Sequence, residues 1–248
     1  MSGDGMNKQP HIAVSAEQVT ERVIVCGEPD RVNRIAALLE QPELLADNRE
    51  YRVMRGRFHD KEITVCSTGI GSPSAIIALE ELAQCGAKYM VRVGSAGALQ
   101  AEVALGELIV AEAAVRDEGG SKAYVETAFP AVANHQLVAG MEAYLNEHNY
   151  PAHYGIVRSH DSFYTDEEDQ LCQYWNKKGV LGADMETSAL LTVGKLRGVK
   201  VASVLNNVVL YQQDVQDGVN QYVNADDVMM QGEITAAKAA LHALCIQP

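Results

Sequence analysis

Residues 89–98 read YMVRVGSAGA, a nearly continuous apolar run that ends in a small-residue turn. So little polar alternation is typical of a strand that is buried on both faces of a sheet. The segment before it, at 76–83, carries apolar residues at helical spacing, which predicts one of the helices that would cover such a strand. This stretch therefore indicates a parallel or mixed sheet with helices on both faces.

The same alternation of strand and helix continues in both directions. Composition and periodicity predict further strands at 22–26, 52–58, 62–67, 107–111, 153–158 and 199–206. Further helices are expected at about 32–39, 135–148, 183–193 and 225–244. No linker rich in Pro, Gly and Ser, internal repeat or low-complexity segment interrupts the pattern. We predict a disordered or flexible N-terminus at 1–10 and a single α/β domain at 11–248, with three α/β/α layers and a central mixed, twisted sheet.

Composition excludes several classes of function. The net charge is −13, whereas general nucleic-acid binding needs a basic face. The five cysteines are scattered, with no CxxC pair and no Cys/His cluster at zinc-ligand spacing, so we expect buried free thiols and no metal site. No apolar run approaches the ~20 residues that span a bilayer, and the polar N-terminus does not resemble a signal peptide. We therefore expect a cytoplasmic protein with no nucleic-acid or membrane partner.

Three glycine-containing turns follow predicted strands, at 27–31, 69–74 and 94–98. In an α/β sheet, ligands bind at the carboxyl ends of the strands, and glycine there lets backbone N–H groups approach an anion. None of the turns is a complete GxGxxG or a P-loop, so a dinucleotide site is not indicated. Together the turns favour an anion site, although each one alone is more often a plain tight turn.

Charged residues in apolar surroundings point to the same edge of the sheet. Arg92 lies inside the apolar run, and Arg31 lies just after the first glycine turn. A buried guanidinium needs an ion-pair partner or a bound anion, and phosphate suits its fork of donors, so both interpretations stay open. Asp184 and Glu186 flank one apolar residue; they are either acceptors for a ribose diol or an acidic pair that favours a helix N-terminus.

Short motifs follow one another from about His11 to the C-terminal helix. They are Gly27-Glu-Pro-Asp-Arg-Val32, Asn48-Arg-Glu-Tyr51, Ser67-Thr-Gly-Ile-Gly-Ser72, Glu80-Glu-Leu82, Arg92-Val-Gly-Ser-Ala-Gly97, Phe129-Pro-Ala-Val132, Asp161-Ser-Phe-Tyr164 and Asp184-Met-Glu186. In this order and spacing they resemble the nucleoside phosphorylase family, which includes uridine phosphorylases and hexameric bacterial purine nucleoside phosphorylases. The resemblance implies the α/β/α fold of that family, with its central mixed sheet.

The resemblance implies a phosphate site. Gly27, Arg31, Arg92 and Ser95 match the residues that hold phosphate in the family. Arg49 matches an arginine that reaches the phosphate in the neighbouring subunit's site. The positively charged side chains are then expected to converge on one anion at the edge of the sheet.

The resemblance also implies a nucleoside site. His11 matches a histidine of the neighbouring subunit that contacts the ribose 5′-hydroxyl. Glu186 matches the carboxylate that binds the ribose hydroxyls. Met185 matches a methionine packed against the sugar, and Phe163 an aromatic that lies against base and sugar. Sites shared in this way require at least a homodimer, and the family's common assembly predicts a trimer of dimers.

The expected base pocket departs from both main subfamilies. Purine-cleaving members carry an aspartate that helps to protonate the leaving base, where this chain has asparagine, and an amide cannot act as that acid. Asn207 fits the asparagine of uridine phosphorylases, but Val208 replaces the arginine that follows it. Glu167 and Asp169 stand where those enzymes recognise uracil with glutamine and arginine. An acidic run of this kind is more often a solvated loop than a base site.

The combined pattern predicts phosphate-dependent cleavage of a nucleoside to free base and ribose 1-phosphate, a pentosyl transfer in nucleoside catabolism and salvage. Arg92, Glu186 and Asn207 are the expected catalytic residues, with Phe163, Glu167 and Asp169 beside the base. Phosphate is the co-substrate, and no metal or organic cofactor is expected. Three functions stay open: a uridine phosphorylase-like enzyme, a purine nucleoside phosphorylase with atypical base recognition, and a catalytically degenerate nucleoside- or phosphate-binding protein.

Overall fold

A mixed ten-stranded sheet forms the centre of the computed structural model, which describes residues 7–223 and 227–248. Hydrogen bonding follows the order β10-β6-β8-β9-β5-β1-β4-β3-β2, with β7 paired to β6. The strands are β1 (Arg22–Cys26), β2 (Glu40–Asn48), β3 (Tyr51–Phe58), β4 (Lys61–Ser67), β5 (Tyr89–Ala98), β6 (Leu108–Asp117), β7 (Ala131–Val132), β8 (Ala152–His160), β9 (Gly182–Asp184) and β10 (Lys200–Val209).

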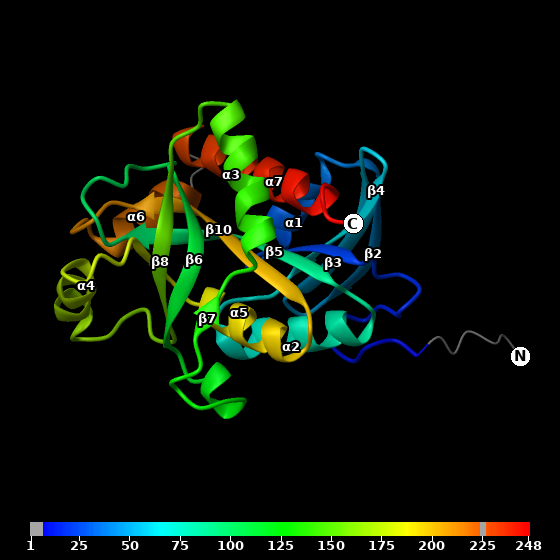
Figure 1. Ribbon diagram of the computed structural model, residues 1–248, viewed down its shortest axis with the longest axis horizontal. Helices are drawn as coiled ribbons and strands as arrows, with labels where there is room; N and C mark the ends of the chain where they lie inside the picture. The colour runs from blue at the N-terminus through cyan, green and yellow to red at the C-terminus, as the bar shows by residue number, and fades with distance from the viewer. Residues whose placement is uncertain (1–6, 224–226) are drawn as a thin grey trace, which may run out of the picture.

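Helices cover both faces of this sheet (Figure 1). The helices α1 (Pro29–Ala36), α3 (His135–Glu147) and α7 (Asp227–Cys245) pack on one face, and α2 (Ser72–Gln84) and α5 (Thr187–Leu196) pack on the other. This arrangement confirms the predicted α/β/α fold with a mixed sheet. The remaining helical segments are η1 (Ser121–Ala123), α4 (Glu168–Asn176) and α6 (Val215–Val223).

The sheet closes on itself over part of its width. The strand β10 pairs with β5 in parallel and with β6 antiparallel, so β10, β6, β8, β9 and β5 form a ring. The strands β1, β4, β3 and β2 extend from β5 as an open sheet. The sequence predicts the mixed sheet but not this closure, because ring closure depends on pairings between segments far apart in the chain.

The strand β5 lies in the middle of the sheet and is buried on both faces, as predicted. Val91 and Val93 face α1, α3 and α7, whereas Met90 faces α2 and α5. Because side chains alternate along a strand, Arg92 shares the face of Met90, and Ser95 shares the face of Val93. Burying each apolar side chain of this kind contributes about 1.5–3 kcal/mol to the free energy of folding. The packing of β5 therefore holds the backbone of Arg92 and Ser95 in a fixed position.

The structure corrects several boundaries. The expected turn at 94–98 is wrong, since these residues continue β5 to Ala98. The expected helix start at residue 183 is also wrong, because Gly182–Asp184 is the strand β9 and α5 begins at Thr187. The acidic run interpreted as a solvated loop instead begins a helix, α4. The first two residues of the expected helix at 225–244 lie outside the described residues, and α7 accounts for the rest.

The N-terminal segment is described only from residue 7, so residues 1–6 of the expected flexible tail lie outside the described part of the chain. Within it, the Gln9 amide donates to the Val14 carbonyl at 2.8 Å. None of the helices at 7–223 and 227–248 is both long and apolar enough to cross a membrane.

Candidate active site

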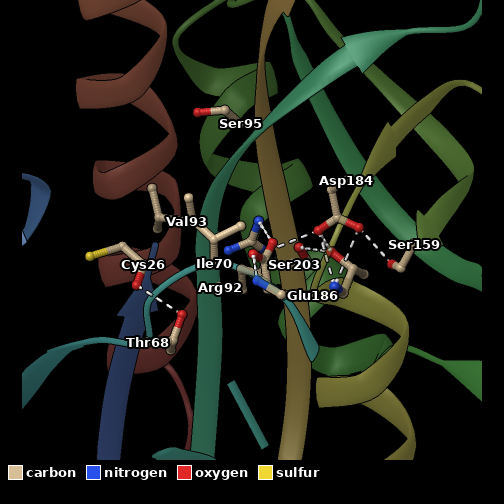
Figure 2. A network of polar contacts seen from close by, with 12 residues as sticks. Cys26, Thr68, Ile70, Arg92, Val93, Ser95, Ser159, Asp184, Glu186 and Ser203 are labelled. Carbon is tan, nitrogen blue, oxygen red and sulfur yellow. Dashed lines mark hydrogen bonds and ion pairs between the residues drawn. The ribbon is translucent and has the colours of Figure 1, made fainter. Parts of the chain in front are cut away.

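Arg92 is the most deeply buried cation of the predicted site, with 3% of its surface exposed. Its Nε donates to Asp184 Oδ2 at 3.0 Å, and its Nη2 donates to Glu186 Oε2 at 2.6 Å (Figure 2). Its Nη1 is buried and has no hydrogen-bond partner within residues 7–223 and 227–248. A buried donor of this kind costs about 1–3 kcal/mol when it stays unsatisfied. The guanidinium is thus ion-paired on two sides and open to one further acceptor.

Asp184 holds the Nε side of that guanidinium and is itself held in place. Ser159 donates to Oδ1 at 2.5 Å, and the hydroxyl of Thr187, the first residue of α5, donates to Oδ2 at 2.6 Å. The Thr187 amide also donates to Oδ2 at 3.0 Å. Figure 2 shows Asp184 between Arg92 and Ser159. These donors come from β8 and α5, so two elements fix the carboxylate that aims Arg92.

Glu186 connects Arg92 to the second glycine turn. Its Oε1 accepts a hydrogen bond from the Gly71 amide at 2.7 Å, and its Oε2 accepts from Arg92. Gly71 has φ +93°, which favours glycine. Burial raises the pKa of the Glu186 carboxyl, and the positive charge of Arg92 partly opposes that rise. Each carboxylate oxygen has a further lone-pair site, so Glu186 can accept two more hydroxyl donors without releasing either partner.

Arg31 and Ser95, two residues of the expected phosphate site, are in contact. Arg31 Nη2 donates to Ser95 Oγ at 2.8 Å, and Nη1 donates to the Val93 carbonyl at 3.1 Å. Arg31 Nε donates to Glu233 Oε2 at 2.8 Å. Gly27 lies at the end of β1, where a Cβ would meet the Gly69 carbonyl at 3.9 Å. The first two glycine turns therefore lie side by side.

The described contacts place the two arginines in different networks. Arg92 contacts residues on the α2 and α5 face of β5, whereas Arg31 contacts residues on the α1 and α7 face. Ser95 stands apart from the Arg92 network, farther along β5 (Figure 2). Arg31 nevertheless reaches the strand next to Arg92, because the carbonyl that accepts from its Nη1 belongs to Val93, the residue after Arg92. Convergence of both guanidiniums on one anion stays a prediction.

His11 and Arg49 form a separate group at the surface. Glu81 accepts hydrogen bonds from the His11 and Ile12 amides and lies 2.6 Å from His11 Nδ1. Asn48 donates to the His11 carbonyl at 2.8 Å, which places His11 beside the β2–β3 turn. Arg49 is exposed in that turn with φ +57°. The two residues expected to reach a neighbouring subunit thus lie together, and neither has a described hydrogen bond to Arg92.

The predicted base residues are more dispersed. Phe163 is half-buried between β8 and α4, and Glu167 and Asp169 are exposed at the start of α4. Glu168, between them, is the residue that turns inward, because its Oε1 accepts from Arg158 Nη1 at 2.9 Å. Arg158 was not predicted from the sequence. Its place after Ile156 and Val157 in the predicted strand at 153–158 was the available signal, weaker than the apolar run around Arg92.

Asn207 and Met185 lie on either side of β5 in the ring. Asn207 is buried beside Ala96, and its Nδ2 donates to the Val103 carbonyl at 3.2 Å and the Ala104 carbonyl at 3.1 Å. Its amide group therefore anchors the chain at 103–104. Met185 is half-buried between Asp184 and Glu186. Among the described residues no group of three or more His, Cys, Asp and Glu side chains could hold a metal ion.

Comparison with known proteins gives consistent relatives. Residues 21–243 match the family model described as the phosphorylase superfamily. A guanosine phosphorylase of Halorubrum lacusprofundi is 37% identical over 80% of this chain and 82% of its own length. A uridine phosphorylase of Escherichia coli is 34% identical over 89% of each chain.

Solved structures agree with the sequence relatives. A uridine phosphorylase from Vibrio fischeri ES114 superposes with a TM-score of 0.92 and 63% identity, covering 98% of this chain and 100% of the other. A purine nucleoside phosphorylase from Toxoplasma gondii, solved in complex with immucillin-H, has a TM-score of 0.87 and 31% identity over 98% and 97% of the two chains.

Proposed function

This chain belongs to the phosphorylase superfamily, and from that premise we propose that it is a uridine phosphorylase-like nucleoside phosphorylase. It transfers the ribosyl group of a nucleoside to phosphate and releases the free base, so it is a pentosyltransferase of nucleoside catabolism and salvage. The observation that carries the proposal is the buried Arg92: within the described residues it has two carboxylate partners, and its Nη1 has none. A ligand oxygen that accepts a hydrogen bond from Nη1 would satisfy this remaining donor of Arg92.

Phosphate and ribose have complementary places around this group. A phosphate oxygen at Arg92 Nη1 would supply the missing acceptor, with Gly27, Arg31 and Ser95 as its other contacts. The ribose 2′- and 3′-hydroxyls would donate to the unused lone pairs of Glu186, while Met185 packs against the sugar. Arg92 then holds the anion, and its ion-pair partner Glu186 holds the sugar.

The reaction follows from that placement. As the glycosidic bond lengthens, the ribose gains positive charge, and a phosphate on the opposite face stabilises it and then bonds to C1′. The base leaves with the bonding electron pair. Orientation and preorganised electrostatics supply most of the acceleration. Inorganic phosphate is the co-substrate, and the proposal includes no metal or organic cofactor.

Two further candidates have specific support. The guanosine phosphorylase relative favours a purine nucleoside phosphorylase with atypical base recognition, although the Asn207 amide is bound to backbone carbonyls. The exposed positions of Glu167 and Asp169 favour a binding protein that has lost its base contacts. The intact group around Arg92 argues against the latter. The cytoplasm is the proposed location.

We also propose that two subunits share each site. His11 and Arg49 lie together at the surface of one subunit and would reach the 5′-hydroxyl and the phosphate of the next. A homodimer is then the minimum active unit, and a trimer of dimers is the proposed assembly.

A panel of uridine, thymidine, inosine, guanosine and adenosine, each with and without phosphate, tests the proposed activity. We expect base release that requires phosphate and is fastest with uridine. Release from inosine or guanosine alone would support the purine alternative. Absence of turnover, together with thermal stabilisation by nucleoside and phosphate, would support the binding protein.

A further inference from the structure

The C-terminal helix places a buried carboxylate directly behind Arg31. Glu233 on α7 is 2% exposed and lies 202 residues from Arg31 in the sequence. Its Oε2 accepts from Arg31 Nε at 2.8 Å, and its Oε1 accepts from Arg34 Nε at 2.5 Å. Arg34 Nη2 donates to Oε2 at 3.0 Å. A buried carboxylate is costly unless it is paired in this way.

Contacts on several sides fix the orientation of the Arg31 guanidinium. Glu233 holds Nε, the Val93 carbonyl holds Nη1, and Ser95 Oγ contacts Nη2. A guanidinium is planar and presents its donors as a rigid fork, so holding Nε sets the direction of both Nη groups. Glu233 therefore directs them toward Val93 and Ser95 in the middle of β5.

Two cations share one buried carboxylate in this group. Arg31 and Arg34 share the single buried carboxylate of Glu233. Arg34 also contacts Glu28, whose side chain is 47% exposed and is therefore screened by water. Arg92, in contrast, is paired with two buried carboxylates. Glu233 thus divides its charge between two arginines, whereas two carboxylates act on Arg92 alone.

We propose that Glu233 is a positioning residue for phosphate binding, which acts through Arg31 without touching the anion and makes the C-terminal helix part of the active site. This rests on the proposed function, because it takes Arg31 as a phosphate ligand. Arg34 supports the same arrangement by sharing the charge of Glu233, so that the carboxylate orients Arg31 without fully neutralising it.

The direction in which KM for phosphate changes in Glu233→Gln tests this positioning role. Glu233→Gln keeps the side-chain length but can offer only one carbonyl oxygen to two arginines, and its NH₂ group would face one of them. We expect KM for phosphate to rise about tenfold, the effect of losing a single charge-assisted hydrogen bond, while KM for the nucleoside stays within about twofold. A simple charge effect would lower KM for phosphate instead, because a negative charge near the anion is removed.

The matched control is Glu80→Gln on α2. Glu80 accepts from Arg197 Nε at 2.8 Å, the same bond as in the Glu233 pair, but Arg197 is exposed and contacts no predicted site residue. Neither KM should change in this control. An unchanged or lower KM for phosphate in Glu233→Gln, or a parallel rise of both KM values, would overturn the positioning role.

Arg34→Gln tests the role without altering the buried carboxylate, in case Glu233→Gln does not fold. The Arg34 side chain is 32% exposed, so the fold should tolerate the change. We expect KM for phosphate to rise about threefold, since Glu233 then neutralises Arg31 more completely. An unchanged KM for phosphate in this variant contradicts the proposal by itself.

Phosphate binding separates this inference from the proposed function. If the wild-type protein shows phosphate-dependent thermal stabilisation but no turnover, the proposed reaction fails, and the variants are compared by the phosphate concentration needed for that stabilisation. Glu233→Gln should then need about tenfold more phosphate. If the wild type neither turns over nor binds inorganic phosphate, both proposals fail.

Discussion

Gly94 determines how closely the Arg92 side chain can approach its own strand. A Cβ on Gly94 would lie 2.6 Å from Arg92 Cζ and Nη2 and 2.7 Å from Leu205 Cδ2. The sequence suggested that this glycine lets a backbone turn approach an anion. In the structure its backbone is extended within β5, so the missing side chain instead leaves room for a guanidinium.

Gly94→Ala should therefore impair the site more than the fold. The new methyl group would push Arg92 away from Asp184 and Glu186, and a displacement of about 1 Å can reduce catalysis by about 10²-fold. Steady-state kinetics should show this loss in kcat/KM for phosphate.

The matched comparison for stability is Gly97→Ala in the same strand, where the nearest atom would be 3.6 Å away. A Gly94→Ala protein with wild-type kinetics would show that Arg92 has more freedom than its contacts suggest.

The sequence predicts the role of a single charged residue where that residue lies in an apolar, buried segment. Arg92 in an apolar run indicated a paired or ligand-bound cation, and the structure confirms that it is buried and paired. Asp184 and Glu186 were expected to be ribose acceptors or a helix N-terminal pair, and in the structure both bind Arg92. Glu233 was not predicted, because its partners lie 202 and 199 residues away. An isolated acid within the largely buried part of α7 was its one local signal.

At the scale of elements, prediction succeeded where burial leaves a periodic pattern. The expected strand at 89–93 and the amphipathic helix at 135–148 correspond to β5 and α3. The strand β2 was missed, since it lies at the sheet edge, is mostly exposed and contains Pro42. The helix α4 was missed because none of its residues is buried, so no apolar stripe marks it.

The rule that ligands bind at strand ends predicted which turns adjoin the site, but it did not predict the hydrogen bonds between the residues of the site. The Gly71 amide does reach Glu186, and the first two glycine turns do adjoin each other. The hydrogen bond from Ser159 on β8 to Asp184 on β9 depends on the parallel β8–β9 pairing. Pairing between distant strands has no local sequence signal, so this part required the structure.

At the scale of the molecule, the shared-site proposal makes a quantitative prediction. In a mixture of Arg49→Ala and Arg31→Ala subunits, each mixed dimer would have one site with both arginines intact and one site lacking both. Random exchange should then restore about a quarter of the wild-type sites. Activity is measured after the two inactive proteins have been denatured and refolded together.

Two differently tagged versions of the variants confirm that mixed oligomers form. Mixed oligomers with no activity above that of the parent variants would contradict a site shared between subunits. Each variant refolded alone provides the baseline.

The fate of phosphate during base release tests the central claim most directly. With uridine and inorganic phosphate, ³¹P NMR should show one ribose 1-phosphate formed for every uracil released. Arg92→Ala leaves Asp184 and Glu186 without their buried partner, so its fold is first checked by circular dichroism; the folded variant should lose this product on the order of a thousandfold. Release of uracil with free ribose in place of the sugar phosphate, or an undiminished rate in Arg92→Ala, would contradict phosphorolysis at this site.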